Sequence, residues 1–157
     1  MNRKIIPDLI KGKRPTGEGR VCELPEDSTA HKAAQQMGRC HVAAIAITNE
    51  DGKLIGIVTE RDLTRRVMGE GLDPRKTKLS EIMSRNLLTL NPEDDAIDAV
   101  KLMAENHCRH LPVVDGKGRI VAMMSIRHLY QATQQDMEDD MSEYRAFVFD
   151  SGYSIRH

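Results

Sequence analysis

The first half of the chain carries a helical pattern of apolar positions just after a polar segment. Apolar residues stand at positions i, i+3, i+4 and i+7, the spacing that places side chains on one buried face of an amphipathic helix. Asp27 or Ser28 precedes this pattern, and either side chain can cap the helix N-terminus. The apolar positions of this predicted helix are Ala30, Ala33, Ala34 and Met37.

Two short apolar runs follow this helix and predict a β-hairpin. The runs cover residues 42–47 and 54–58, and residues 49–52 between them read Asn-Glu-Asp-Gly, a typical turn sequence. A polar stretch from Thr59 to Arg66 then has helical character. The first half therefore predicts a helix, a hairpin and a second helix in that order.

The second half of the chain repeats this order. Thr89 lies on a short predicted strand, Asn91-Pro92 opens a helix, residues 111–114 and 120–124 form a hairpin, and a final helix begins at about Ser125. The apolar face of the first of these helices is expected to hold Ala96, Ala99, Val100 and Met103.

A constant offset of 66 residues relates the two halves, as between Gly56 and Ala122. A register that runs without a gap over about forty residues indicates an internal duplication. The same offset pairs Leu24 with Leu90, Ala30 with Ala96, Ala33 with Ala99, Met37 with Met103, His41 with His107 and Gly52 with Gly118.

Each repeat is therefore predicted to be strand-helix-strand-strand-helix, which gives an α/β fold. A three-stranded sheet with helices on one face leaves its other face uncovered, so the two repeats are expected to pack on each other. We expect an N-terminal helix and loop at 1–19, repeats at 20–78 and 79–135, and an acidic tail at 136–157.

Composition excludes several functional classes. The net charge is -1, aromatic residues make up 3% of the chain and Trp is absent, which argues against a nucleic-acid-binding surface. No apolar run is long enough to span a membrane, and the polar start lacks a secretory signal, so we expect a cytoplasmic protein. Because Cys22, Cys40 and Cys108 form no CxxC pair, reduced thiols are expected.

One sequence in the first repeat combines the groups that bind a phosphorylated ligand. Thr59 stands where a strand becomes a helix, so its hydroxyl and the nearby backbone N–H groups can meet a phosphate. Asp62 can accept both hydrogen bonds of a ribose diol, and Gly56 can let a ligand approach the backbone. The alternative is structural, because a Thr followed three residues later by an acid also resembles a capping box that only starts a helix.

The repeat and its motifs resemble the CBS domain family. The likeness rests on a Gly, two apolar residues, Thr, two further residues and Asp at 56–62, and on Arg-His-Leu-Pro-Val-Val-Asp at 109–115. It covers residues from about 20 to 133. The resemblance implies two CBS domains packed about a pseudo-twofold axis as one Bateman module, with two clefts that in many members bind AMP, ADP, ATP, NAD or S-adenosylmethionine.

The resemblance also implies roles for individual residues: Thr59 would contact phosphate and Asp62 the ribose hydroxyls. The second repeat departs from the pattern, because Ala122 replaces the glycine and His128 replaces the aspartate, so the cleft that holds Asp62 is the better candidate. His128 could instead meet a phosphate when protonated, or lie on an exposed helix without a ligand role. The expected ligand-binding residues are Gly56, Ile57, Thr59, Asp62, Thr89, Arg109, His110, Pro112, Ser125 and His128.

Other clusters have simpler explanations. Cys40, His41, His107, Cys108 and His110 could bind zinc, but a polar helix end before a strand explains them better, so no metal site is expected. Positive charge is concentrated after the first motif and could contact phosphates or an acidic partner, or simply be a solvated helix face and linker. The residues are Arg61, Arg65, Arg66, Arg75, Lys76 and Lys78. No nucleophile with a base, Walker loop or catalytic carboxylate pair is present, which argues against an enzyme.

The sequence therefore predicts a stand-alone regulatory or sensor CBS pair that needs no cofactor and responds to an adenosine-type ligand. The output is expected through a homodimer or a regulated protein in trans. A constitutive dimeric scaffold with vestigial clefts is the alternative. Apolar residues on the helices after the two motifs are expected at the dimer contact: Leu63, Val67, Met68, Leu129, Ala132 and Met137. Residues 147–149 could add an edge strand or a further dimer contact.

Overall fold

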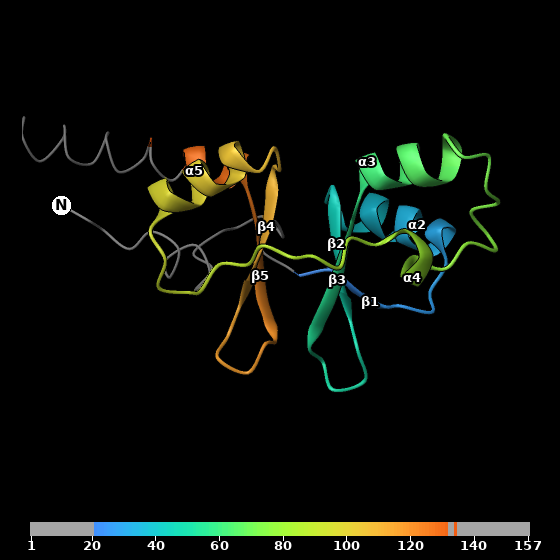
Figure 1. Cartoon of the computed structure of the whole chain (residues 1–157), viewed down its shortest axis with the longest axis horizontal. Coiled ribbons are helices and arrows are strands. Elements are labelled where there is room, and N and C mark those ends of the chain that lie inside the picture. Colours follow the sequence, from blue (N-terminus) through green and yellow to red (C-terminus); the bar gives the residue numbers. More distant parts are fainter. Residues whose placement is uncertain (1–20, 132–133, 135–157) are drawn as a thin grey trace, which may run out of the picture.

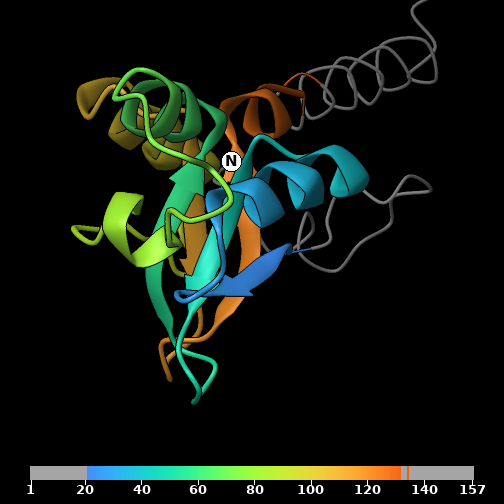
Figure 2. The ribbon, with the colours of Figure 1, turned by 90° about the vertical axis from the view of Figure 1, so that its right-hand side faces the viewer.

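The computed structural model describes residues 21–131 and 134. Its two halves lie side by side, with their hairpins next to each other at the centre and helices α2, α3 and α5 toward one end (Figure 1). A view from the side shows both hairpin turns at the opposite end (Figure 2). The predicted helix at 5–10 and the tail with its apolar patch at 147–149 lie outside the described residues.

The order of elements confirms the predicted duplication of a strand-helix-strand-strand-helix unit. The first repeat contains β1 (Glu23–Pro25), α2 (Ala30–Cys40), β2 (Ala44–Thr48), β3 (Leu54–Thr59), α3 (Glu60–Asp62) and the π-helical turn η1 (Leu63–Met68). After the short helix α4 (Leu79–Ile82) come α5 (Ala96–Glu105), β4 (His110–Val114), β5 (Ile120–Ser125) and a helical segment at 126–131.

The register of the strands follows the duplication. In the first repeat β1 pairs parallel with β2, with Leu24 opposite Ile47, and β2 pairs antiparallel with β3. In the second repeat β4 pairs antiparallel with β5, and the counterpart of β1 is reduced to one parallel bridge between Leu90 and Val113. The two parallel pairs are related by the offset of 66 residues.

The helices begin later than the sequence predicts. Thr29 caps α2, since its side chain accepts a hydrogen bond from the Lys32 N–H at 3.2 Å, so the assignment of Asp27 or Ser28 is wrong. Helix α5 begins at Ala96 rather than near residue 91. The Asp94 carboxylate accepts from the Asn91 N–H at 2.8 Å and closes a turn before the helix. Asp95 then caps α5.

Both faces of β2 are buried, each by a different part of the molecule. Ile45 and Ile47 are fully buried and pack with α2 in the core of the first repeat. Ala44 and Ala46 lie on the other face and are also buried, and β2 contacts β5 of the second repeat. The small alanine side chains let the two sheets approach closely, as expected for repeats that cover one another.

The second repeat has its own core on the helix side of its sheet. Met103 of α5, Val113 of β4 and Leu129 of the final helical segment are fully buried there. At the far end of the molecule the Leu54 N–H donates to the Gly118 carbonyl at 3.1 Å, which joins the two hairpin turns. The repeats therefore have separate cores and a shared seam.

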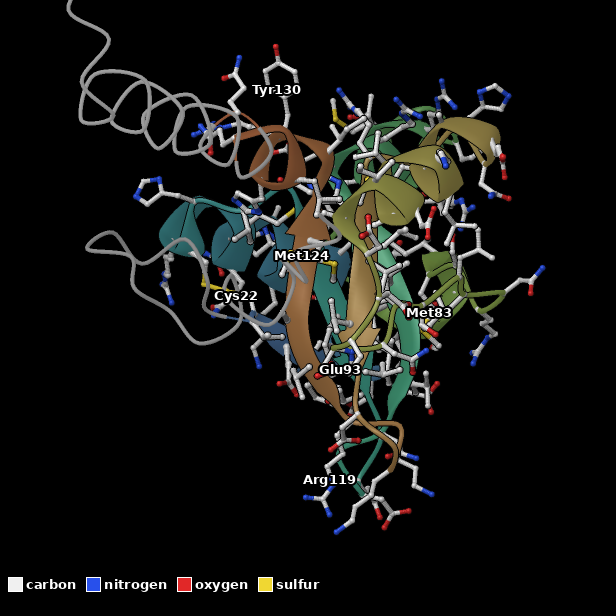
Figure 3. All side chains as sticks on the ribbon, turned by 90° about the vertical axis from the view of Figure 1, so that its left-hand side faces the viewer. Cys22, Met83, Glu93, Arg119, Met124 and Tyr130 are labelled. Atoms are coloured by element: carbon white, nitrogen blue, oxygen red, sulfur yellow. A yellow bond between two sulfur atoms is a disulfide. The ribbon has the colours of Figure 1, made fainter. Side chains whose placement is uncertain are left out.

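Cys22 and Cys40 form a disulfide, so the expectation of reduced thiols is wrong for this pair (Figure 3). They lie 18 residues apart in the sequence, but the fold brings the segment before β1 and the end of α2 to a Cα–Cα distance of 6.9 Å. This proximity arises from tertiary packing, which a search for CxxC spacing does not detect. Cys108 is a free thiol.

The absence of a side chain at Gly56 makes room for Met83. A Cβ atom at position 56 would lie 2.3 Å from the Met83 sulfur and 3.2 Å from its Cβ, and Met83 is 6% exposed. Met83 follows α4 in the linker between the repeats. The missing side chain at Gly56 therefore lets this linker residue pack in the core of the first repeat.

Gly56→Ala is therefore expected to lower the free energy of unfolding by about 1 to 3 kcal/mol, because a buried methionine must move. Gly38→Ala is the matched control. Gly38 lies on the exposed face of α2, and an added Cβ there would have no neighbouring atom within 4 Å. That change should stabilise the helix by about 0.4 to 1 kcal/mol. Urea unfolding measures both, and equal stability of Gly56→Ala and wild type would contradict this role for Gly56.

Candidate functional site

Two clefts lie between the repeats and share part of their walls. Cleft A has a volume of about 470 Å³ and lies where β3 ends and β4 begins. Cleft B has a volume of about 320 Å³ and lies where β2 begins and β5 ends. Ala43, Glu60, Arg109 and His110 line both clefts.

The motif at the end of β3 forms the floor of cleft A and adopts a complete capping box. One oxygen of the Asp62 carboxylate, Oδ2, accepts from the Thr59 N–H and from the Thr59 hydroxyl, both at 2.9 Å. The Asp62 N–H donates to the Thr59 hydroxyl oxygen at 3.3 Å. The structural alternative raised by the sequence is therefore present, and it fixes the carboxylate at the cleft surface.

The second oxygen of Asp62 faces Arg66. Arg66 Nε lies 3.5 Å from Asp62 Oδ1, and the two side chains are 47% and 15% exposed. The same guanidinium donates through Nη1 to the carbonyl of Ile82, the last residue of α4. Arg66 thus connects the motif of cleft A to the linker between the repeats.

That linker forms a wall of cleft A. The Ile57 N–H donates to the Ser84 carbonyl at 3.1 Å, and the Ser84 N–H donates to the Ile57 carbonyl at 3.0 Å. This bridge holds the linker along β3, where Ser84 and the residues at 86–88 line the cleft. Sequence reasoning missed this wall, because residues 84–88 belong to neither repeated motif.

The opposite wall of cleft A comes from residues 106–112 of the second repeat. Arg109, His110 and Pro112 lie there, as the resemblance implied, together with Cys108. Burial lowers the pKa of His110 below its usual range, and the charges of Arg109 and His128 lower it further. Burial raises the pKa of the Cys108 thiol, which disfavours the reactive thiolate.

Ser125 and His128 line cleft B. They repeat half of the capping geometry of Thr59 and Asp62, because the His128 N–H donates to the Ser125 hydroxyl oxygen at 3.2 Å. The carboxylate that completes the box in the first repeat has no counterpart at position 128. The pseudo-twofold thus brings the two motifs to equivalent places in different clefts.

Two of the predicted binding residues lie away from both clefts. Gly56 lies beneath Met83, so its small size serves core packing and not close approach of a ligand in cleft A. Thr89 lines a shallow hollow with Leu54 and Arg85. The other eight predicted residues line one cleft or both: Ile57, Thr59, Asp62, Arg109, His110, Pro112, Ser125 and His128.

The residues considered for zinc are not gathered into one site. His41 lines cleft B and His107 lines cleft A, so the pseudo-twofold does not bring them together. Cys40 is taken up by the disulfide. Within residues 21–131 and 134, no three His, Cys, Asp or Glu side chains are placed to hold a metal ion.

The helices of this same part of the chain are too short or too polar to cross a membrane.

Comparison with known proteins identifies both halves of the molecule. Residues 21–69 and 79–134 match the family model of the CBS domain. The CBS domain-containing protein CBSX3, mitochondrial, of Arabidopsis thaliana is 30% identical over 147 residues, which cover 91% of this chain and 71% of the plant protein.

Solved structures agree with this assignment. The CBS-domain containing protein ATU1752 from Agrobacterium tumefaciens superposes with a TM-score of 0.72 at 26% identity, covering 82% of this chain and 92% of that chain. The cytosolic domain of the Mg2+ channel MgtE in complex with ATP superposes with a TM-score of 0.60 at 26% identity, covering 71% of this chain and 44% of the channel chain.

The connection made by Arg66 can be tested without a ligand. Arg66→Met keeps an unbranched apolar stem but removes the guanidinium and both of its polar contacts, so the linker should detach more often from β3. We expect hydrogen exchange at the Ile57 and Ser84 amides to accelerate, with a loss of about 1 kcal/mol in the free energy of unfolding. Arg65→Met, at an adjacent exposed position, is the control. Equal exchange in the two variants would show that Arg66 does not hold the linker.

Proposed function

This chain belongs to the CBS-domain family, with two CBS domains in tandem, and we propose that it is a regulatory protein that binds an adenosine-type ligand in cleft A. The observation that carries the proposal is the Asp62 carboxylate at the cleft surface. Its capping box fixes Oδ2, while Oδ1 lies 3.5 Å from Arg66 Nε, an ion pair within the described part of the chain. A preoriented carboxylate oxygen of this kind suits the hydroxyl donors of a ribose.

The other properties of cleft A suit the same ligand class. Its volume of about 470 Å³ lies within the usual range of small-molecule sites, roughly 300 to 1,000 Å³. Apolar side chains such as Ile57 and Leu111 can contact a base, and Arg61 and Arg109 can neutralise phosphates. A relative of 26% identity, the MgtE cytosolic domain, was solved in complex with ATP. The candidates are AMP, ADP, ATP, NAD and S-adenosylmethionine.

We propose a regulatory role and not a catalytic one. The comparisons identify two CBS domains and no catalytic domain. A regulatory ligand acts by binding one conformation better than another, so it needs an element that the cleft can influence. The linker is such an element, because Ser84 lines cleft A and Arg66 joins Asp62 to Ile82. A cytoplasmic location stays a prediction from the sequence, and the disulfide is unusual for a reducing compartment.

A homodimer and a regulated protein in trans are also part of the proposal. The sequence argument for the dimer is wrong for two of its residues, because Val67 and Leu129 are buried within their own repeats. Leu63 packs partly against the first core, whereas Met68 is 77% exposed and Tyr130 is 59% exposed. Ala132 and Met137 lie outside the described residues. The exposed apolar surface available for a dimer contact is therefore smaller than the sequence predicts.

The ligand test compares Asp62→Ala with Glu81→Ala by isothermal titration of the five candidate compounds. Glu81 is the matched control, because its carboxylate also completes a capping box, accepting from the Lys78 N–H at 3.0 Å, but does not line cleft A. Both changes should cost about 1 kcal/mol of stability. Only Asp62→Ala should weaken the bound compound, by about 10 to 100 fold.

The same titration separates the alternatives. If none of the five compounds binds the wild-type protein, the scaffold with vestigial clefts is the better description. If one binds equally well to wild type and Asp62→Ala, the ligand lies elsewhere than proposed.

The dimer is tested by light scattering at micromolar concentration, with and without the compound that binds. We expect a mass near twice 17.7 kDa, because two-fold symmetry is the commonest way for a soluble protein to cover a small apolar surface. Met68→Glu should shift the mass toward the monomer if this exposed residue lies at the contact, and Glu70→Gln at a nearby exposed position serves as the control. A monomer mass for wild type under both conditions would remove the dimer from the proposal.

A further inference from the structure

Cleft B is more basic than cleft A. Five cationic or ionisable basic side chains line it among the described residues, together with one carboxylate, that of Glu60. In cleft A two carboxylates, those of Glu60 and Asp62, accompany four such basic side chains, those of Arg61, His107, Arg109 and His110. The basic side chains of cleft B are His41, Arg109, His110, Arg127 and His128.

The difference arises at positions that the duplication makes equivalent. The Ser125–His128 turn has the backbone geometry of the Thr59–Asp62 turn, with amide-to-hydroxyl distances of 3.2 and 3.3 Å. The backbone therefore presents position 128 to cleft B as it presents position 62 to cleft A. An imidazole stands where the ribose-accepting carboxylate would be, so cleft B lacks the acceptor for a diol.

A second substitution within the duplication adds a fixed positive charge. The Glu60 N–H donates to the Ala43 carbonyl at 3.0 Å, and the equivalent Ile126 N–H donates to the Arg109 carbonyl at 2.9 Å. Arg109 therefore occupies the place of Ala43. The equivalent backbone position carries a methyl group in one repeat and a guanidinium, which lines both clefts, in the other.

The third basic group comes from the end of α2. His41 caps this helix with φ of 54°, in the left-handed region where glycine is the usual residue. A histidine there costs conformational energy relative to glycine. The position places an imidazole in the lining of cleft B shortly before β2, and the equivalent His107, with φ of 51°, places one in the lining of cleft A.

We propose that cleft B binds a small multivalent anion of the phosphate type, without a ribose contact, and that protonation of its histidines strengthens the binding. The volume of about 320 Å³ suits a few linked phosphate groups and lies at the small end of the range for ligand sites. This anion site lies in cleft B and needs no ligand in cleft A, so it goes beyond the proposed function and can exist without it.

The surroundings of His110 explain the pH dependence. Burial lowers the pKa of His110, and the charges of Arg109 and His128 lower it further. His110 lines cleft B, so an anion bound there favours the protonated ring, and binding takes up protons and tightens as pH falls. The ionisable groups that line the clefts around His110 are His41, Glu60, Arg61, Asp62, His107, Cys108, Arg109, Arg127 and His128.

The test titrates the full chain with trimetaphosphate, whose three acidic groups stay ionised between about pH 6 and about pH 8, so any pH dependence belongs to the protein. We expect the affinity to rise at least about five-fold across this interval at constant ionic strength, with proton uptake measured in buffers of different ionisation enthalpy. His128→Gln should weaken binding at about pH 6 by a similar factor and reduce the proton uptake. His31→Gln, which removes an imidazole of α2 outside both clefts, should change neither.

Two further measurements place the anion. Saturating adenosine, which has no phosphate, should not displace trimetaphosphate, because Arg127 and His128 line cleft B and not cleft A. Since Arg109 and His110 line both clefts, a change of a few fold in the affinity is compatible with two sites, whereas displacement is not. His128→Asp restores the capping carboxylate of the first repeat, so it should fold, lose trimetaphosphate binding and gain an adenosine site. This variant keeps the proposal testable if His128→Gln proves unstable.

Three outcomes would overturn the proposal: no trimetaphosphate binding at millimolar concentration, equal binding in wild type and His128→Asp, or displacement of the anion by adenosine. Failure of the proposed function has a different signature. In that case none of the five adenosine compounds binds cleft A, while trimetaphosphate still binds in a manner that depends on His128.

Discussion

The need to bury both faces of each sheet is the constraint on which the rest of this structure depends. Helices cover one face, where Ile45 and Ile47 meet the core of the first repeat. The other face of β2, with Ala44 and Ala46, is buried because the second repeat lies against it. Clefts A and B lie at one end of the contact between the two sheets, where strands end and helices begin. The two clefts thus result from how the duplicated sheets cover one another.

Duplication makes the two clefts alike in backbone and leaves their chemistry to single side chains. The turns at Thr59 and Ser125 share their hydrogen-bond geometry, so the backbone presents residue 62 and residue 128 in the same way. Asp62 gives cleft A a carboxylate, and His128 gives cleft B a group that can be positive. Because the scaffold is common, a change of one residue at such a position changes the class of ligand without rebuilding the fold.

The sequence predicted what is repeated or local. The order of elements and the hairpin turns followed from apolar periodicity and turn residues, and the motif residues Thr59 and Asp62 lie in a cleft. Contacts between distant segments could not be predicted from the sequence. They are the packing of Met83 against Gly56, the disulfide of Cys22, and the linker wall at Ser84. No pattern within a repeat encodes these contacts, because each depends on where the linker or the entry strand comes to lie.

The capping box shows that the structural and functional interpretations of the motif do not exclude each other. Asp62 uses Oδ2 to start the helix and leaves Oδ1 facing Arg66, so one carboxylate can serve folding and binding through different oxygens. A diol that donates to Oδ1 competes with the weak ion pair of Arg66. That arginine also holds the Ile82 carbonyl at the start of the linker. Under the proposed function, a ligand in cleft A would therefore act first on the linker, which joins the two repeats.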